Sequence, residues 1–226
     1  MGAGIERAFI LTGGGAMHLN DALTRNKLIK STFMHHEQAL AMAAEGYARV
    51  VGKAAIVNVT SGPGGINALN GVFGAFVDSI PMVIISGQSR TETIAQLHNK
   101  NLRQLGDQEA NMFSITRSVV KYFAMPQNKY EALSAIDRAL LVLQQGRPGP
   151  IWIDIPINVQ GVFLTSTEIE QSLTYSIKPV LEAIHPNTKD NSPNKADIKE
   201  SVEKTIDLLN LSKRPVFFGG NGINLS

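Results

Sequence analysis

The sequence predicts an α/β fold: a parallel β-sheet flanked by helices on both faces, plus the start of a second α/β domain. Segments with strand and helix character alternate as far as Pro156, and the strands are continuous apolar runs rather than alternating ones. Both features are typical of a parallel sheet that is covered by helices. Clusters of glycine and polar residues follow several strands. Because the carboxyl ends of parallel strands share one edge, we expect these clusters to line that edge together.

The composition fits a well-buried globular protein. The 226 residues are 43% apolar and 18% charged. The net charge is +2, and the basic residues are scattered along the chain rather than clustered. We therefore expect neither a nucleic acid nor a membrane as partner. The sequence contains no cysteine, which excludes disulfides and thiolate metal sites and fits a cytoplasmic location. No apolar run reaches membrane-spanning length, and the first residues lack a secretory signal pattern.

Four short apolar runs predict the first four strands, and three helical segments alternate with them. The strands are expected at residues 8–12, 28–34, 54–60 and 81–86. The helices are expected at residues 16–24, 38–51 and 66–76. Gly52 is well placed to end the second helix, because glycine commonly follows the last helical residue.

The chain from residue 87 onward alternates less regularly. A polar stretch at residues 87–111 precedes two further strands, expected at residues 119–123 and 151–155. Between these strands, apolar residues at helical spacing predict a helix over residues 130–145, which Gly146 ends.

Past Pro156 the composition changes, which predicts three parts of the chain. Residues 1–164 are expected to form the first domain. Residues 165–196 are rich in Ser, Thr, Asn, Asp, Lys and Pro, and are expected to be a linker. Residues 197–226 are expected to be the truncated start of a second α/β domain, with a helix at 198–211 and a strand and glycine turn at 214–222.

Glu37 is the first candidate functional residue. It stands where an extended apolar run gives way to a helix rich in Ala and Met. A carboxylate among small apolar residues is costly to bury unless it has a partner. The alternative, left open by this stretch alone, is a carboxylate that only complements the dipole of its own helix.

The glycine-rich segment Gly62-Pro63-Gly64-Gly65 follows a strand and precedes a helix. Such a loop can cradle a ligand with its backbone N–H groups. The Lys-Ser/Thr of a phosphate loop is missing, and Asn67 stands where a dinucleotide fingerprint needs glycine. A nucleotide-binding protein is therefore disfavoured, while a tight turn without a ligand remains an alternative. The same ambiguity applies to Gly13-Gly14-Gly15.

Metal and hydrolase sites are not predicted. His35 and His36 are adjacent in an extended segment and point to opposite faces, and no zinc-motif spacing includes them or His18. Ser61 and Ser86 lack the glycine frame of a nucleophile elbow. Trp152 lies on a core strand, where we expect it to serve packing.

The order of these motifs resembles the N-terminal, pyrimidine-binding domain of thiamine-diphosphate enzymes of the acetolactate synthase type. The resemblance runs from about Phe9 to Pro156, and residues 213–222 look like the first strand of the family's middle domain. The motifs that carry it are, in order, Gly13-Gly14-Gly15-Ala16, His36-Glu37-Gln38, Glu45-Gly46-Tyr47-Ala48-Arg49, Thr60-Ser61-Gly62-Pro63-Gly64, Asn67, Asp78-Ser79-Ile80-Pro81-Met82 and Gly146-Arg147-Pro148-Gly149-Pro150.

The resemblance implies roles for individual residues. Glu37 matches the catalytic glutamate, which hydrogen-bonds N1′ of the aminopyrimidine and so helps its 4′-nitrogen remove the proton from the thiazolium C2. Gly62, Pro63 and Asn67 match the loop beside the pyrimidine. The resemblance further assigns Gly14 and Gly15 to the turn that approaches the active centre, and Gln108 and Glu109 to a Gln-Glu pair in the active-site loop.

The resemblance also implies an activity and partners. We expect a fragment of a lyase or transferase that decarboxylates a 2-oxo acid and ligates the product to an acceptor. Thiamine diphosphate is the cofactor. Its Mg²⁺ and diphosphate are held by a domain absent from this chain, supplied by a second subunit of a homodimer or homotetramer, so the chain alone is expected to be inactive. Nothing in the sequence supports FAD. The alternative is a non-catalytic homologue that serves assembly or regulation, against which intact Glu37, Pro63 and Asn67 argue.

Two features of the resemblance leave questions open. Asp107 stands where the family has a phenylalanine before the Gln-Glu pair, which favours a hydroxylated or cationic substrate over an apolar one. The helices at 38–51 and 66–76 carry small residues that permit either pairing of two copies or packing within one chain. These small residues are Ala43, Ala44, Gly71, Gly74 and Ala75.

Overall fold

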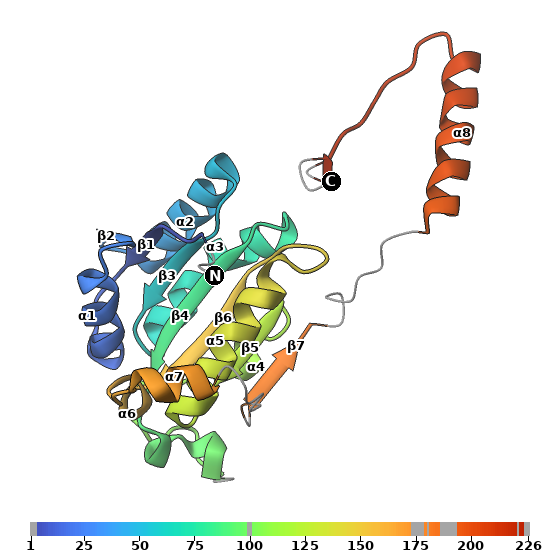
Figure 1. Ribbon diagram of the computed structural model, residues 1–226. Coiled ribbons are helices and arrows are strands. Elements are labelled where there is room, and N and C mark those ends of the chain that lie inside the picture. Colours follow the sequence, from blue (N-terminus) through green and yellow to red (C-terminus); the bar gives the residue numbers. More distant parts are fainter. Residues whose placement is uncertain are drawn as a thin grey trace.

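The computed structural model describes residues 4–98, 101–172, 179, 181–185, 194–220 and 222–223. They form a seven-stranded sheet in the order β2-β1-β3-β4-β6-β5-β7 (Figure 1). All neighbouring strands are parallel except β7, which runs antiparallel to β5. The predicted α/β class, with a largely parallel sheet between helices, is confirmed.

Each of the predicted strands of the first domain is present, with ends shifted by a few residues. These strands are β1 Arg7–Ile10, β2 Lys30–Phe33, β3 Ala55–Val59, β4 Met82–Gln88, β5 Tyr122–Met125 and β6 Ile151–Pro156. A further strand that was not predicted is β7 Leu181–Ile184. The residues of β3, β5 and β6 are all buried, which explains why these segments are apolar without alternation.

The predicted helices are also present, and shorter helices occur between them. The helices are α1 Met17–Arg25, α2 Glu37–Val51, α3 Pro63–Val77, α4 Met112–Thr116, α5 Lys129–Gln144, α6 Ile157–Gln160, α7 Ser166–Ser172 and α8 Lys195–Leu211. Three short 3-10 helices are η1 Gly14–Ala16, η2 Thr91–Thr93 and η3 Ala95–His98. The last two lie in the stretch that the sequence shows only as polar.

A hydrophobic cluster lies on each face of the sheet. On one face, Leu40 of α2 and Val72 of α3 pack with Trp152 of β6. On the other face, Ala139 of α5 packs with Tyr122 of β5. Trp152 and Tyr122 come from strands, and the other three side chains come from helices. Each layer of the core thus lies between the sheet and the helices that cover it.

Helices α2 and α3 pack closely because α3 has a glycine where it meets α2. A Cβ atom added to Gly71 would lie 2.7 Å from both the Cβ of Ala41 and the backbone N of Met42. A Cβ atom added to Gly74 would have no neighbour within 4 Å. Packing within the chain is therefore confirmed at Gly71, while the pairing of two copies stays a prediction. Gly71 serves packing within the chain, whereas Gly74 leaves open surface.

The helix α5 is fixed at both ends by side chains. At its start, the Asn128 side chain accepts hydrogen bonds from the backbone N–H groups of Tyr130 and Glu131. At its end, the buried Lys121 Nζ donates to the carbonyl oxygen of Gln145 at 2.7 Å. Burial lowers the pKa of Lys121 to about 8. These bonds explain why the helix starts and ends close to the predicted residues.

The segment expected to be a linker, residues 165–196, contains regular structure. It includes α7 and the edge strand β7, where Leu181 pairs with Met125 and Ile184 with Tyr122 of β5. The side chains of Arg138 and Glu182 form an ion pair at 3.2 Å across this edge. A strand of four partly exposed residues shows almost no recognisable sequence pattern, because its stability comes from pairing with β5. The division at residue 164 therefore does not mark the end of the sheet.

The strand expected within residues 214–222 is not formed. Residues 215–220 have no regular structure, and Val216, Phe217 and Phe218 are exposed. Residue 221 lies outside the described residues. A strand needs a hydrogen-bonding neighbour, and none of the described strands pairs with this segment.

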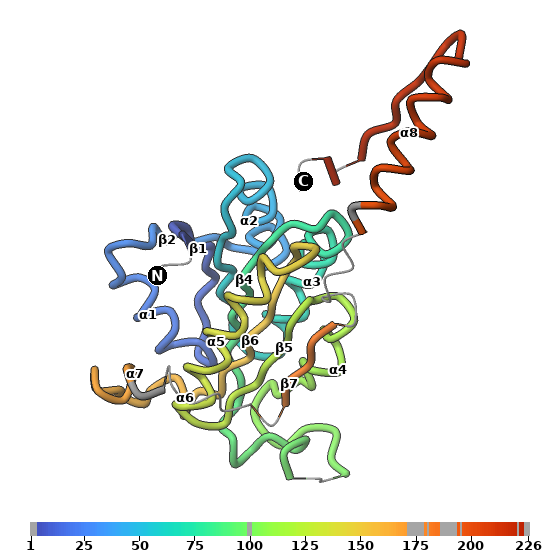
Figure 2. Tube along the Cα trace, turned by 45° about the vertical axis from the view of Figure 1, so that its right-hand side comes forward, coloured from blue at the N-terminus to red at the C-terminus, as the bar shows by residue number. Residues whose placement is uncertain are grey.

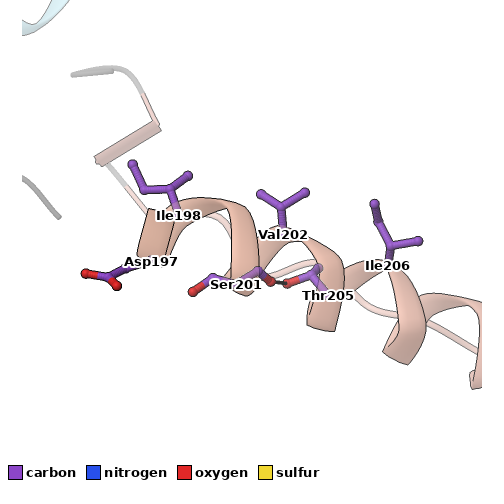
Figure 3. Close-up of a pocket in the computed structure, with 6 residues that line it drawn as sticks. All are labelled: Asp197, Ile198, Ser201, Val202, Thr205 and Ile206. Carbon is purple, nitrogen blue, oxygen red and sulfur yellow. Dashed lines mark hydrogen bonds between the residues drawn. The ribbon is translucent and has the colours of Figure 1, made fainter. Parts of the chain in front are cut away.

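The helix expected at 198–211 is confirmed as α8, which stands apart from the sheet in both views (Figures 1 and 2). Ile198, Val202 and Ile206 project from one side of it and line a shallow hollow of about 400 Å³ (Figure 3). All of the lining residues belong to this one helix. The hollow is therefore the apolar face of an amphipathic helix rather than a candidate site.

Two glycine substitutions in α3 test the close packing of α2 and α3. Gly71→Ala should lower the free energy of unfolding by about 1–3 kcal/mol, because the new methyl group would overlap α2. The matched control Gly74→Ala should raise it by roughly 0.5–1 kcal/mol, because alanine favours the helix and meets no neighbour. Chemical denaturation of both variants measures the difference. Equal effects of the two substitutions would contradict the packing described here.

Candidate functional site

The loops at the carboxyl edge of the sheet carry the predicted site residues. The chain leaves β1 toward Gly14, β2 toward Glu37, β3 toward Gly62, and β4 toward the loop that contains Asp107. Since these strands are parallel, all of these loops start from the same edge. The expectation that these segments line one edge is confirmed.

Glu37 is the first residue of α2 and is half-buried. Its Oε2 atom accepts a hydrogen bond from Nδ2 of Asn67, a residue of α3, at 2.7 Å. The first turn of α3 comes close to the same carboxylate, since a Cβ atom on Gly64 would lie 3.6 Å from Glu37 Oε1. The position of Glu37 suits the dipole of α2, but the bond to Asn67 gives the carboxylate a specific partner as well.

Pro63 and Asn67 line a hollow of about 460 Å³ beside this pair, together with Gln38, Ile66 and Asn70. The hollow therefore has an apolar wall and amide groups that can donate and accept hydrogen bonds.

The Gly13-Gly14-Gly15 turn is held by its neighbours. The backbone N–H of Gly15 donates to Thr60 Oγ1 at 3.1 Å, and Gln160 Nε2 donates to the Gly15 carbonyl at 2.8 Å. A Cβ atom on Gly15 would fall 2.5 Å from Ser61 Oγ, so no larger residue fits there. A Cβ atom on Gly14 would meet nothing within 4 Å. The turn thus packs on one side and is open on the other.

The open side of this turn faces a second, larger hollow of about 560 Å³. Two predicted groups meet here: Gly14 and Gly15 on one side, and Asp107 and Gln108 on the other. Most of the remaining lining residues have polar side chains. The remaining lining residues are Gly13, Met17, Thr60, Ser61, Gln88, Ser89, Arg90, Thr93 and Ile157.

The loop that contains Asp107 and Gln108 touches the glycine-rich loop directly. A Cβ atom on Gly62 would lie 2.1 Å from the Gln108 carbonyl oxygen, and Gly62 has a φ of +54°. Only glycine satisfies both conditions. Glu109 holds the loop, because its Oε2 accepts from the backbone N–H of Leu105 at 2.9 Å and its Oε1 from that of Ala95 at 2.8 Å.

The predicted residues therefore fall into two neighbouring groups. Glu37, Pro63 and Asn67 lie at the starts of α2 and α3. Gly14, Gly15, Asp107 and Gln108 lie at the larger hollow. Gly62 links the groups, since it precedes Pro63 and touches Gln108.

A buried polar network beneath the larger hollow is absent from the sequence prediction. Asp154 of β6 is fully buried, and its Oδ1 and Oδ2 accept hydrogen bonds from Ser86 Oγ at 2.5 Å and Gln88 Nε2 at 2.8 Å. Ser86 Oγ in turn accepts from Trp152 Nε1 at 2.7 Å. The available signal was the presence of Ser86 and Asp154 inside otherwise apolar strands.

The environment of Asp154 raises its pKa from 3.8 to about 7. Burial is the main cause, because it disfavours the charged carboxylate. The hydrogen bonds from Ser86 and Gln88 oppose this effect and favour the charged form. Asp154 is thus a carboxyl group that titrates close to neutral pH.

The described residues offer neither a cluster of metal ligands nor a helix that could span a membrane. No group of three or more His, Cys, Asp or Glu side chains among them could hold a metal ion. None of the helices described is long and apolar enough to cross a bilayer.

Comparison with known proteins shows which family part of this chain is similar to. Residues 2–111 match the family described as "Thiamine pyrophosphate enzyme, N-terminal TPP binding domain". Among solved structures, the Rhodococcus jostii thiamine diphosphate-dependent 4-hydroxybenzoylformate decarboxylase is similar in fold, with a TM-score of 0.68 at 19% sequence identity. The similarity covers 89% of this chain and 34% of that one.

Curated relatives with higher identity carry the name acetolactate synthase. The large subunit from Haemophilus influenzae, the mitochondrial catalytic subunit from Saccharomyces cerevisiae and the chloroplastic protein from Arabidopsis thaliana are each 32% identical over 219 residues. The alignments cover 97% of this chain, but only 35%, 30% and 30% of those proteins, respectively. The chain thus spans about a third of the length of the relatives it matches.

The raised pKa of Asp154 predicts how stability depends on pH. A carboxyl group that binds its proton more tightly in the folded state stabilises that state at low pH, and this contribution is lost as the pH rises from about 4 through about 7. The loss amounts to as much as about 4 kcal/mol. In Asp154→Asn this component should vanish, whereas the exposed control Asp137→Asn should keep it. Denaturant unfolding at pH 5 and pH 8 measures the difference, and an equal pH dependence in all three proteins would argue against the shifted pKa.

Proposed function

We propose that this chain is part of a thiamine-diphosphate-dependent enzyme, because residues 2–111 match the family of N-terminal TPP-binding domains. The reaction is decarboxylation of a 2-oxo acid and ligation of the product to an acceptor, as the name of the acetolactate synthase relatives suggests. The observation that carries the proposal is the Glu37–Asn67 hydrogen bond at the starts of α2 and α3. This bond holds an acid beside the hollow that Pro63 and Asn67 line.

The residues at this hollow fit an aminopyrimidine ring. Pro63 and Ile66 offer apolar surface to the faces of a ring, and Asn67 offers an amide. The carboxyl group of Glu37 can share a proton with a ring nitrogen. Its Oε2 is held by Asn67, while its Oε1 faces the first turn of α3. The proposed binding residues are Gly14, Gly15, Gly62, Pro63 and Asn67, with Glu37 as the catalytic acid–base group.

When bound, thiamine diphosphate supplies an electron sink for the bond that breaks in decarboxylation. The chain supplies a proton relay at Glu37 and its orientation by Asn67. It also supplies the wall of the reaction space, through Gly14 and Gly15 on one side and the loop of Gln108 on the other. The proposal places Mg²⁺ and the diphosphate in a domain outside this chain, which spans about a third of its relatives. FAD is not part of the proposal.

A second subunit completes the proposed site. The helices that carry Glu37 and Asn67 also expose large apolar side chains, namely Met42 on α2 and Ile66, Phe73 and Val77 on α3. A second copy, in a homodimer or homotetramer, would cover this surface and bring its diphosphate-binding domain to Glu37. The chain alone would therefore be inactive. We place the enzyme in the cytoplasm, although the yeast and Arabidopsis relatives are named mitochondrial and chloroplastic.

The non-catalytic alternative, a homologue that serves assembly or regulation, keeps the fold without needing the acid. The Glu37–Asn67 bond argues against it, because assembly alone does not require this pair. Thiamine diphosphate binding by the complete protein, measured by calorimetry, distinguishes the two functions.

The larger hollow suggests the class of acceptor. Its lining includes the carboxylate of Asp107, the guanidinium of Arg90, and hydroxyl and amide groups such as those of Ser89 and Gln88. The carboxylate of Asp107 and these hydroxyl and amide groups favour a hydroxylated or cationic acceptor over an apolar one.

The first test of the function is Glu37→Gln in the complete enzyme. The substitution keeps the size of the side chain but removes the acid, so proton exchange at C2 of bound cofactor should slow by about 10²–10⁴-fold. Nuclear magnetic resonance of quenched samples measures this exchange. Glu45→Gln, in the same helix, is the matched control and should leave the rate unchanged. Exchange at the wild-type rate in Glu37→Gln would sink the assignment.

The second test concerns Asp107 and the acceptor. The wild-type enzyme should ligate pyruvate to hydroxyaldehydes in preference to a second pyruvate, and Asp107→Phe should shift the products toward acetolactate. Product profiling with pyruvate alone, and with pyruvate plus hydroxyaldehydes, measures this preference. Arg103→Phe introduces the same side chain into the loop outside the hollow and is the control. Efficient acetolactate formation by the wild type from pyruvate alone would show that Asp107 has no such role.

A further inference from the structure

The buried network around Asp154 lies between the two groups of site residues. Asp154 on β6 pairs in register with Ser86 on β4, and Gln88 follows two residues later on the same face of the sheet. Each oxygen of the Asp154 carboxylate accepts one hydrogen bond, at 2.5 Å from Ser86 and 2.8 Å from Gln88. One buried carboxylate therefore holds two residues at the end of the central strand that leads into the site.

The first branch of the network runs from Ser86 to α3. Ser86 Oγ donates to Asp154 and accepts from the indole N–H of Trp152, so the orientation of the indole depends on the carboxylate. On the benzene ring of the same indole, a Cβ atom on Gly65 would lie 3.3 Å from Trp152 Cζ2. Gly65 belongs to the first turn of α3, which also carries Pro63 and leads to Asn67.

The second branch runs from Gln88 to the loop of residues 106–110. Gln88 Nε2 donates to Asp154 and to the carbonyl oxygen of Ala110 at 3.0 Å, while Gln88 Oε1 accepts from the N–H of Ser89 at 2.9 Å. Ser89 Oγ donates to the Asp107 carbonyl at 3.0 Å. The same loop places the Gln108 carbonyl against Gly62. The orientation of the Gln88 amide is thus fixed by Asp154 and determines the bonds at both ends of the loop.

We propose that Asp154 is a positioning residue that fixes two segments of the candidate site, the first turn of α3 through Ser86 and Trp152, and the 106–110 loop through Gln88. The roles of these segments, α3 beside the cofactor and the loop beside the acceptor, rest on the proposed function. The coupling of both segments to Asp154 through hydrogen bonds does not. Asp154 touches neither hollow and acts only through its hydrogen-bonded neighbours.

A carboxyl group suits this position. Ser86 and Gln88 both donate to it, and its ionised form, which predominates above the pKa of about 7, accepts on both oxygens without offering a donor. An asparagine would turn an N–H₂ group toward one of them. If the amide of Gln88 rotated to accept from it, Gln88 would lose its bond to the Ala110 carbonyl and oppose the N–H of Ser89 with a second donor.

Hydrogen exchange of the whole chain tests the proposal without reference to activity. In Asp154→Asn, exchange should rise about tenfold or more in peptides covering residues 62–66 and 106–110, because these segments open locally once their anchors are lost. Exchange in β3, at residues 55–59, should stay at the wild-type rate. The matched control Asp137→Asn, an exposed residue of α5, should leave all three segments unchanged.

Two further variants separate the branches. Ser86→Ala should raise exchange at residues 62–66 only, and Gln88→Met at residues 106–110 only. Trp152 is the one tryptophan of the sequence, so its fluorescence reports the first branch alone. The emission should shift in Asp154→Asn and Ser86→Ala and stay constant in Gln88→Met. If Asp154→Asn does not fold, Ser86→Ala and Gln88→Met still test the positioning role of the network.

The outcomes are distinct. Selective loosening of the two segments supports the positioning role. Exchange that rises equally throughout the chain, or that stays at the wild-type rate in Ser86→Ala and Gln88→Met, would overturn it. Failure of the proposed function would instead appear as unchanged C2 exchange in Glu37→Gln, with the selective loosening intact.

Discussion

Backbone-to-backbone contact between loops is the constraint on which the candidate site depends. A Cβ atom on Gly87 would lie 2.0 Å from the Gly15 carbonyl oxygen, and one on Gly62 would lie 2.1 Å from that of Gln108. The end of β4 can approach the turn after β1, and the loop after β4 can approach the loop after β3, only because glycine occupies these positions. Asp107 and Gln108, on one wall of the larger hollow, belong to a loop that makes such a contact. Methyl groups at these glycines would therefore separate the walls of the site before they affected its chemistry.

Much of this arrangement follows from the sequence, for physical reasons. Buried parallel strands must be apolar on both faces, so the central strands β3 and β6 are easily predicted. Glu37 and Gly62 could be placed at one edge because the strands that precede them are parallel. Strand β7 could not be predicted, since four partly exposed residues carry no pattern and depend on β5 for stability. The strand expected near Val216 failed for the opposite reason, because an apolar run alone does not supply a pairing partner.

The site residues that sequence reasoning missed act through long-range contacts. Gln88 and Asp154 are distant in sequence, and neither is part of a local motif. Their importance becomes visible only when β4 and β6 pair and bring them to the same face. Thr60 and Gln160 hold the Gly15 turn in the same way. Local motifs thus predicted the groups that face the hollows, while the sheet topology determined the groups that support them.

Strand β7 also has a consequence for the order of folding during synthesis. Strand β5 is buried in the finished protein, yet one of its edges is covered only when Leu181–Ile184 pairs with it. Until the ribosome has made those residues, the growing chain presents an apolar strand with unpaired backbone groups. Such an edge can pair with a neighbouring chain. Translation beyond the predicted domain boundary at residue 164 is therefore part of what protects the nascent sheet from aggregation.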